Sequence, residues 1–163
     1  MNGICVIQNQ NNITGTIEFH QCDKNSLTQV LIKLRGFKPN KTHAIHIHEF
    51  GDLSKGCESL GAHFNPLNKN HGNYKINGNN RHAGDLMNNI TSDSDGNVNL
   101  MFEDNLISLY KYSPLFIIGR SVVIHEKPDD LGLGGTQESL TTGSAGARIA
   151  CAVIGLSKEK HLF

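Results

Sequence analysis

Short segments in which apolar and polar residues alternate recur along the whole chain. β-branched and aromatic residues hold most apolar positions, and clusters rich in Gly, Asn, Asp and Ser separate the segments. This pattern predicts eight β-strands: Gly3–Gln8, Ile13–His20, Leu27–Leu34, Thr42–His48, Leu86–Thr91, Val98–Glu103, Arg120–Ile124 and Arg148–Ile154. Apolar residues nowhere keep helical spacing for three turns, so the pattern favours an all-β sandwich or barrel with little helix.

Two of the predicted connections, Glu49 to Asp85 and Glu126 to Ala147, are far longer than a hairpin needs, and both are rich in Gly, Asn, Asp and His. Ordered loops of this length usually carry function. The chain shows no repeat, linker or composition break, and its 163 residues suffice for one core. We therefore expect a single domain, residues 1–163, with two functional loops.

The charge pattern argues against polyanionic partners. Fifteen Lys and Arg residues balance fifteen Asp and Glu residues, and no run of five basic residues occurs, so we expect no nucleic-acid partner. The absence of an apolar stretch near ~18 residues predicts no membrane partner. The N-terminal residues lack the features of a signal peptide, which predicts a cytoplasmic protein, or one in the host cytoplasm or virion if the source is viral.

Histidine is the unusual component of the chain, with nine residues against three tyrosines and no tryptophan. Because side chains alternate along a strand, His46 and His48 share one face of the strand Thr42–His48, while Ile45 and Ile47 face the core. His43 falls on the core side, where a hydrogen bond to the backbone is the favoured interpretation.

The long loop and a later strand add further ligand-type side chains, namely His63, His71, His82, Asp85 and His125. Four imidazoles without sulfur suit tetragonal Cu(II), whereas three imidazoles with a carboxylate suit tetrahedral Zn(II). The available residues allow both sites only if one histidine is shared, as an imidazolate between two cations. A copper site joined to a zinc site is the interpretation that needs the fewest ligands.

Five runs of the sequence together resemble the Cu,Zn superoxide dismutase family, and the resemblance extends from Gly3 to Leu156. These runs are HIHEFGD (46–52), GAHFNP (61–66), RHAGDL (81–86), VIHEK (123–127) and GSAGARIAC (143–151). The resemblance implies an eight-stranded antiparallel Greek-key sandwich or barrel. It also implies an oxidoreductase with antioxidant activity, which converts superoxide to dioxygen and hydrogen peroxide by copper redox chemistry.

The resemblance assigns the ligands of one copper and one zinc per subunit. The implied copper ligands are His46, His48, His63 and His125, and the implied zinc ligands are His63, His71, His82 and Asp85. His63 bridges the metals and is expected to carry a proton during turnover. Asp129 is implied to hydrogen-bond His46 and His71, Arg148 to dock the anionic substrate, and Thr142 to line the channel rim.

The resemblance also implies a disulfide between Cys57 and Cys151. Cys5, within a strand, is expected in the core, and Cys22 lies in a predicted turn. The family is usually a homodimer, and we expect the contact near the Phe50–Gly51–Asp52 turn and four apolar residues: Ile7, Val153, Ile154 and Leu156. Copper arrives through a dedicated chaperone or without one, and the sequence leaves that alternative open.

The main alternatives are non-catalytic. A copper-chaperone-like domain, a metal-binding decoy or a metal-buffering module would use the same histidines. The chaperone and decoy hypotheses predict lost ligands, yet all seven ligand residues and Asp129 are present. Arg148 argues against a buffering module, because storing metal needs no group that docks an anion.

Overall fold

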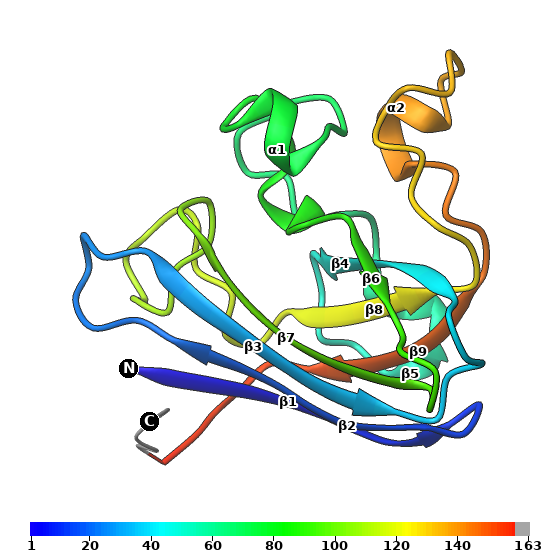
Figure 1. The fold of residues 1–163 in the computed structure, drawn as a ribbon. Coiled ribbons are helices and arrows are strands. Elements are labelled where there is room, and N and C mark those ends of the chain that lie inside the picture. The colour runs from blue at the N-terminus through cyan, green and yellow to red at the C-terminus, as the bar shows by residue number, and fades with distance from the viewer. Residues whose placement is uncertain (159–163) are drawn as a thin grey trace.

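The computed structural model describes residues 1–158 as two antiparallel β-sheets with short helical turns in the connections (Figure 1). Residues 159–163, which the predicted domain includes, lie outside the described residues. The strands are β1 (Asn2–Gln10), β2 (Ile13–His20), β3 (Thr28–Arg35), β4 (Thr42–His48), β5 (Ser54–Cys57), β6 (Asn89–Thr91), β7 (Asn97–Asp104), β8 (Ser121–His125), β9 (Arg148–Val153) and β10 (Gly155–Leu156). The helical turns are η1 (Glu58–Leu60), α1 (Tyr74–Asn77), η2 (Ala83–Asp85) and α2 (Ser139–Thr142).

The two sheets contain strands β10-β1-β2-β3-β7 and β6-β4-β8-β9, in that order. The first three strands are neighbours in the five-stranded sheet. The chain then crosses to the four-stranded sheet between β3 and β4, returns to the first sheet between β6 and β7, and crosses again between β7 and β8. This is the predicted antiparallel Greek-key sandwich. No helix in residues 1–158 is long and apolar enough to cross a membrane.

Alternating apolar side chains from both sheets form one core. Ile17, Phe19 and Ile32 come from the five-stranded sheet, and Ile45 and Ile47 come from β4; all five are at most 1% exposed. Cys5 belongs to the same buried cluster, as the strand pattern predicted. The alternation that buries the isoleucines of β4 also turns His46 and His48 away from this core.

All eight predicted strands are present, but the one predicted over Leu86–Thr91 is shorter, and β5 and β10 were not predicted. β6 begins only at Asn89, because Leu86 and Asn88 both have positive φ, at 48° and 68°. Leu86 is nevertheless fully buried. Its apolar character reflects core packing after the turn η2, and the sequence pattern alone does not distinguish this from a strand.

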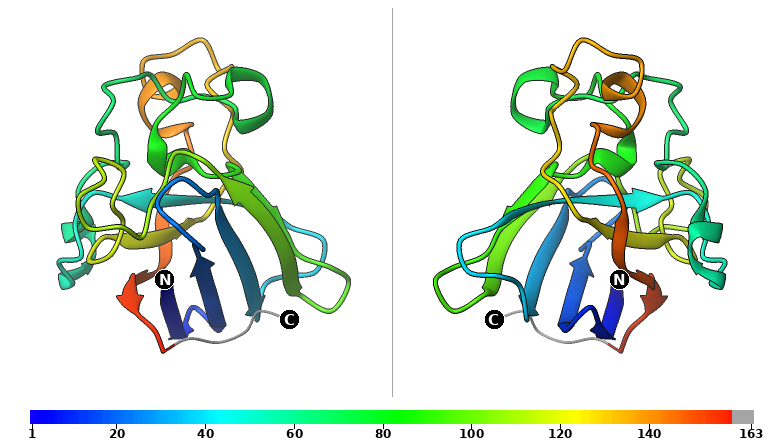
Figure 2. Two further views of the ribbon diagram at one scale, coloured as in Figure 1. Left: turned by 90° about the vertical axis from the view of Figure 1, so that its left-hand side faces the viewer. Right: turned by 90° about the vertical axis from the view of Figure 1, so that its right-hand side faces the viewer.

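Both long loops rise above the same end of the sandwich (Figure 2). The first carries β5, η1, α1 and η2, and the second carries α2. Two covalent or ionic links tie the first loop to the sheets. The disulfide Cys57–Cys151 joins it to β9, as the resemblance implied. The buried guanidinium of Arg81 donates to both carboxylate oxygens of Asp104, at 2.9 and 2.8 Å.

We predict that Ile17→Ala lowers the free energy of unfolding by about 2–5 kcal/mol, because Ile17 is completely buried and truncation leaves a cavity. Met101→Ala, on the outer face of β7 with 55% exposure, is the control and should change it by less than about 0.5 kcal/mol. Urea denaturation followed by circular dichroism measures both. Equal losses in the two variants would contradict this description of the core.

Candidate metal centre

The strand β4 presents His46 and His48 on the face opposite Ile45 and Ile47, as the alternation predicted. Both imidazoles are buried, with 0% and 2% exposure, because the two long loops cover this face of the sheet. His63 comes from the first loop and forms an isolated bridge with His48. His125 is the last residue of β8, which pairs with β4.

Four imidazole nitrogens in this region are buried without a hydrogen-bond partner. They are Nδ1 of His46 and Nε2 of His48, His63 and His125. Buried polar atoms normally have a hydrogen-bond partner, so four unpaired nitrogens in one place require an explanation. All four residues offer a ligand atom within 4.8 Å of the others, which is close enough for one ion to reach every nitrogen.

The second nitrogen of each ring is held by the surrounding protein. His48 Nδ1 donates to the Gly61 carbonyl at 2.9 Å, and His125 Nδ1 donates to the Gly146 carbonyl at 3.1 Å. His46 Nε2 donates to Asp129 at 2.6 Å. Since these bonds place the proton on the outer nitrogen, the inner nitrogen carries a lone pair. Four imidazole donors without sulfur fit copper(II).

Burial reinforces this protonation state. It lowers the pKa of His63 to about 3 and that of His125 to about 4, and nearby histidines and Arg148 contribute in the same direction. Burial also holds the pKa values of His46 and His48 below the ordinary range. All four rings are therefore neutral at physiological pH, which is the form that binds a metal.

A second group of ligands surrounds one carboxylate oxygen, Oδ1 of Asp85. The Nδ1 atoms of His71, His63 and His82 lie 2.7, 3.1 and 3.1 Å from it. The edge of a tetrahedron around zinc is about 3.3 Å for ligands ~2.0 Å from the ion, so these separations are close to those of a zinc site. Three imidazoles and a carboxylate fit zinc.

Asp85 is fully buried at the centre of this group. Although burial alone raises its pKa, hydrogen bonds from the three histidines hold the pKa far below the ordinary range. Its other oxygen, Oδ2, accepts from the backbone N–H groups of Gly72 and His82, at 3.0 and 2.9 Å. The carboxylate is therefore charged and its orientation is fixed before any cation binds.

His63 belongs to both groups. Its Nε2 is one of the four unpaired nitrogens, and its Nδ1 faces Asp85 and lies 3.4 Å from Nδ1 of His82. The two ring nitrogens thus point into two different candidate sites. The structure brings together all seven ligand residues that the sequence predicted, in the two predicted groups.

Asp129 links the two groups from outside. Its Oδ2 accepts from His46 Nε2 at 2.6 Å, and its Oδ1 accepts from His71 Nε2 at 2.8 Å. Burial opposes the charged form of Asp129, but these two bonds keep its pKa well below the ordinary value. His71, held between Asp85 and Asp129, has a pKa of about 9 despite its own burial. A cation bound at Nδ1 of His71 would replace the proton there.

Two parts of this network were not predicted from the sequence. Asn88 is buried and donates to Asp129 at 3.3 Å and to the Gly72 carbonyl at 2.9 Å, while its Oδ1 accepts from the N–H of Tyr74. The buried Arg81–Asp104 pair anchors the residue before His82. A polar residue three positions after a ligand was the only available signal for Asn88, and it is a weak one.

A cavity of about 250 Å³ opens above the four-histidine group. Its lining includes His48, His63, His125, Glu138, Thr142 and Arg148. The guanidinium of Arg148 donates from Nη1 to the Cys57 carbonyl and from Nη2 to the Gly61 carbonyl, each at 2.7 Å. These two bonds hold its charge beside the cavity. Thr142 is exposed, and its hydroxyl donates to the Glu138 carbonyl at 3.1 Å.

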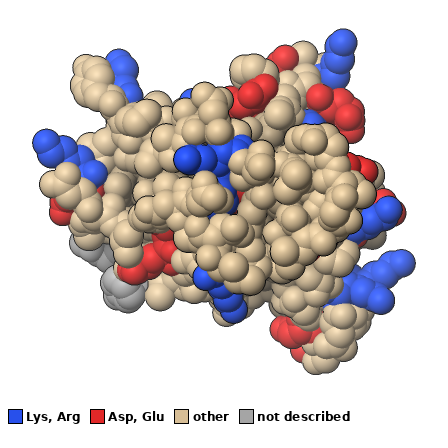
Figure 3. All heavy atoms as spheres, turned by 90° about the horizontal axis from the view of Figure 1, so that it is seen from above, with Lys and Arg blue, Asp and Glu red and all other residues tan. Residues whose placement is uncertain are grey.

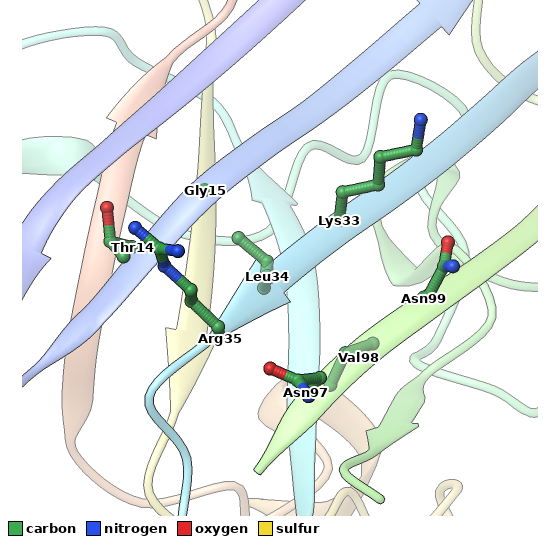
Figure 4. Close-up of a pocket in the computed structure, with 8 residues that line it drawn as sticks. All are labelled: Thr14, Gly15, Lys33, Leu34, Arg35, Asn97, Val98 and Asn99. Atoms are coloured by element: carbon green, nitrogen blue, oxygen red, sulfur yellow. The ribbon is translucent and has the colours of Figure 1, made fainter. Parts of the chain in front are cut away.

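A second cavity, on strands β2, β3 and β7, offers no comparable chemistry (Figure 4). Lys33 and Arg35 are its only charged residues, and its lining contains no His, Cys, Asp or Glu. Seen from the side of the two long loops, basic and acidic side chains lie around the edge of the molecule, and one basic group lies near the middle of the face (Figure 3). The cavity at the candidate metal centre therefore has the ligand-type residues that this second cavity lacks.

Comparison with known proteins agrees with this geometry. The copper/zinc superoxide dismutase family model matches residues 13–154. The chain is 45% identical to the Cu-Zn superoxide dismutase of Schizosaccharomyces pombe, over 94% of this chain and 97% of that protein. It is 46% identical to Cu-Zn superoxide dismutase 5 of Dictyostelium discoideum, over 97% and 99% of the two chains.

The solved structure of the clock protein EA4 has a TM-score of 0.85 and 42% identity, and covers 94% of this chain and 93% of its own. Fold, ligand chemistry and sequence therefore lead to one assignment. The chain belongs to the copper/zinc superoxide dismutase family and is an oxidoreductase whose histidine groups fit the copper and zinc sites.

Proposed function

We propose that the residues of this chain divide the work of superoxide dismutation between two metal sites and one anion-docking cavity. His46, His48, His63 and His125 hold copper, and His63, His71, His82 and Asp85 hold zinc. The observation that carries the copper assignment is a set of four buried, unpaired nitrogens on four residues whose ligand atoms lie within 4.8 Å of one another. Bound copper supplies one-electron redox chemistry, and bound zinc supplies a fixed positive charge without redox chemistry.

The protein residues supply docking and protons. Arg148 docks the superoxide anion in the cavity, with its guanidinium held by the two carbonyls of the first loop. His63 would hold a proton on Nε2 whenever that nitrogen does not ligate copper, and would pass it to the departing peroxide. Two superoxide anions and two protons then give one dioxygen and one hydrogen peroxide. Thr142 and Glu138 form the rim through which the anion enters.

Asp129 is a positioning residue in this proposal. Its two oxygens fix the ring of one copper ligand and the ring of one zinc ligand, so both sites depend on one carboxylate. The arrangement supports coupled assembly of the two metals. A cytoplasmic location and a single domain stay predictions from the sequence, and copper delivery with or without a chaperone stays an open alternative.

We also propose that the chain forms a homodimer, through a surface that differs in part from the one expected. Ile7 and Ile154 are fully buried in the core and have no surface to offer. Phe50 and Leu156 are 53% and 67% exposed. The turn after Phe50 packs against the end of β9. A Cβ atom placed on Gly51 would lie only 3.2 Å from a side-chain carbon of Val153. This places Phe50 beside the strand end that leads to Leu156.

The ligand assignment predicts the metal content of three variants. We expect the wild-type chain to bind one copper and one zinc. His125→Ala should lose copper and activity but retain zinc, and His82→Ala should lose zinc. Asp129→Asn should weaken the binding of both metals by about 10–100-fold, because the Asp129 carboxylate contacts one ligand of each metal. Mass spectrometry of metal content and a superoxide assay on the same samples measure this. A fully loaded wild-type chain without turnover would instead identify a metal-binding decoy.

The docking role predicts that Arg148→Gln lowers kcat/KM on the order of tenfold, because one charge near the surface contributes about 1–4 kcal/mol. The remaining rate should depend less on salt, and Arg148→Lys should restore part of it. Pulse radiolysis at several ionic strengths measures these rates. Arg35→Gln, at the other cavity, is the control and should keep the wild-type rate; a similar loss there would refute specific docking by Arg148.

The dimer surface predicts that Phe50→Glu produces a monomer, because a carboxylate in place of an exposed aromatic ring would be desolvated at the contact. Met101→Glu replaces a residue of similar exposure on β7 and should leave the dimer intact. Sedimentation velocity of the metal-loaded chains measures both. A wild-type chain that sediments as a monomer would overturn the proposal.

A further inference from the structure

Cys22, in the turn after β2, is the one exposed cysteine of the chain. The other three are unavailable for chemistry. Cys57 and Cys151 form the disulfide, and burial raises the pKa of the Cys5 thiol far above its ordinary value. The turn that carries Cys22 lies at the left of Figure 1, whereas α2 of the metal-site loops lies at the right. Cys22 is therefore a thiol that the metal chemistry does not use.

A histidine and an asparagine accompany this thiol. Sγ of Cys22 lies 3.4 Å from Nε2 of His20, and Nδ1 of the same ring lies 2.6 Å from Oδ1 of Asn2. The second contact is built into the sheet, because Asn2 and His20 are directly opposite each other in the pairing of β1 with β2. A nucleophile, a base and a third group that orients the base are thus aligned.

The asparagine determines which nitrogen of His20 bears the proton. An amide oxygen only accepts, so Nδ1 must donate to Asn2, and the neutral ring then has a bare Nε2. That bare nitrogen is the one that faces Cys22. His20 is therefore arranged to accept the proton of the Cys22 thiol.

The backbone around Cys22 is held in place by several hydrogen bonds. The Cys22 carbonyl accepts from the hydroxyl of Tyr110 at 3.1 Å. The preceding residue, Gln21, is buried, and its side-chain oxygen accepts from Ser108 and from the N–H of Leu109. The N-terminal amine of Met1 donates to the Gln21 carbonyl at 2.6 Å. These hydrogen bonds fix the turn and so keep the Cys22 thiol close to the His20 imidazole.

The charged neighbours do not block the thiol. The carboxylate of Asp23 is occupied by hydrogen bonds from the Asn25 N–H and the Ser26 hydroxyl. Lys24, two residues after Cys22, lines a cavity of about 450 Å³ with Tyr110, whose hydroxyl contacts the Cys22 carbonyl. Cys22 itself is exposed, and Lys24 carries a positive charge two residues further along the same turn.

We propose that Cys22 is a peroxide-sensitive thiol, deprotonated by His20 and oxidised reversibly by hydrogen peroxide. The oxidant rests on the proposed function, because dismutation produces hydrogen peroxide. The sulfur attacks one peroxide oxygen, the O–O bond breaks, and the imidazolium of His20 protonates the leaving hydroxide. The products are Cys22 sulfenic acid and one water, with sulfur oxidised by two electrons and the peroxide reduced by two.

The experiment compares thiol reactivity in metal-loaded wild-type chain and variants at neutral pH. Iodoacetamide alkylation and trapping of sulfenic acid by dimedone after added peroxide are followed by peptide mass spectrometry. We expect modification at Cys22 and not at Cys5. His20→Gln should slow both reactions on the order of tenfold, because the base is lost. Asn2→Ala should slow them less, and Asn2→Asp, which still accepts from Nδ1, should restore them.

Gln29→Ala is the matched control, because Gln29 lies opposite His20 on the other neighbouring strand and has no bond to the thiol. It should react at the wild-type rate. Equal rates in wild type and His20→Gln would show that exposure alone governs Cys22 and would overturn the proposal, as would alkylation without sulfenic acid. Since both reagents are added, the result does not depend on dismutase activity, which is measured separately.

Discussion

The structure depends on one constraint: six imidazoles and two carboxylates are packed together, and each of these residues is at most 6% exposed. Burial opposes the charge on Asp85 and Asp129, and four ring nitrogens have no partner within the protein. Such a cluster is costly unless cations occupy it, because unpaired buried lone pairs and charges lose their hydration. Metal binding therefore also stabilises the folded form of the two loops, which supply five of these eight groups.

The protein meets this constraint by dividing support between rigid sheet and anchored loop. His46, His48 and His125 stand on paired strands whose opposite faces form the core, so their backbone positions are set by ordinary packing. The loop ligands lack this support. The Cys57–Cys151 disulfide and the Arg81–Asp104 pair supply it instead, and the same disulfide segment offers the Cys57 carbonyl to Arg148. Loop stability and the proposed docking of the anion by Arg148 are thus coupled through one short segment.

Much of the fold and the ligand set follows from short-range patterns. Period-two alternation located the core strands and placed His46 and His48 on one face, and the ligand motifs determined the grouping around His63. The failures have a common cause, since burial of a residue depends on what packs over it. Leu86 resembled a strand residue although it follows a turn, and Ile7 and Ile154 were expected at an interface although both lie in the core. Asn88 and the Arg81–Asp104 pair join residues that no local pattern relates.

The two outer faces of the sandwich illustrate how one alternation rule produces different chemistry. On β4 the outward His46 and His48 lie beneath long loops, and burial keeps both rings neutral, the form that fits a metal site. On β2 the outward His20 is only partly buried and lies beside an exposed turn, so its free nitrogen meets a thiol instead of other imidazoles. Ring nitrogens in both places are aligned by a hydrogen bond on the far side of the ring. What covers the strand therefore decides whether an outward histidine binds a cation or accepts a proton.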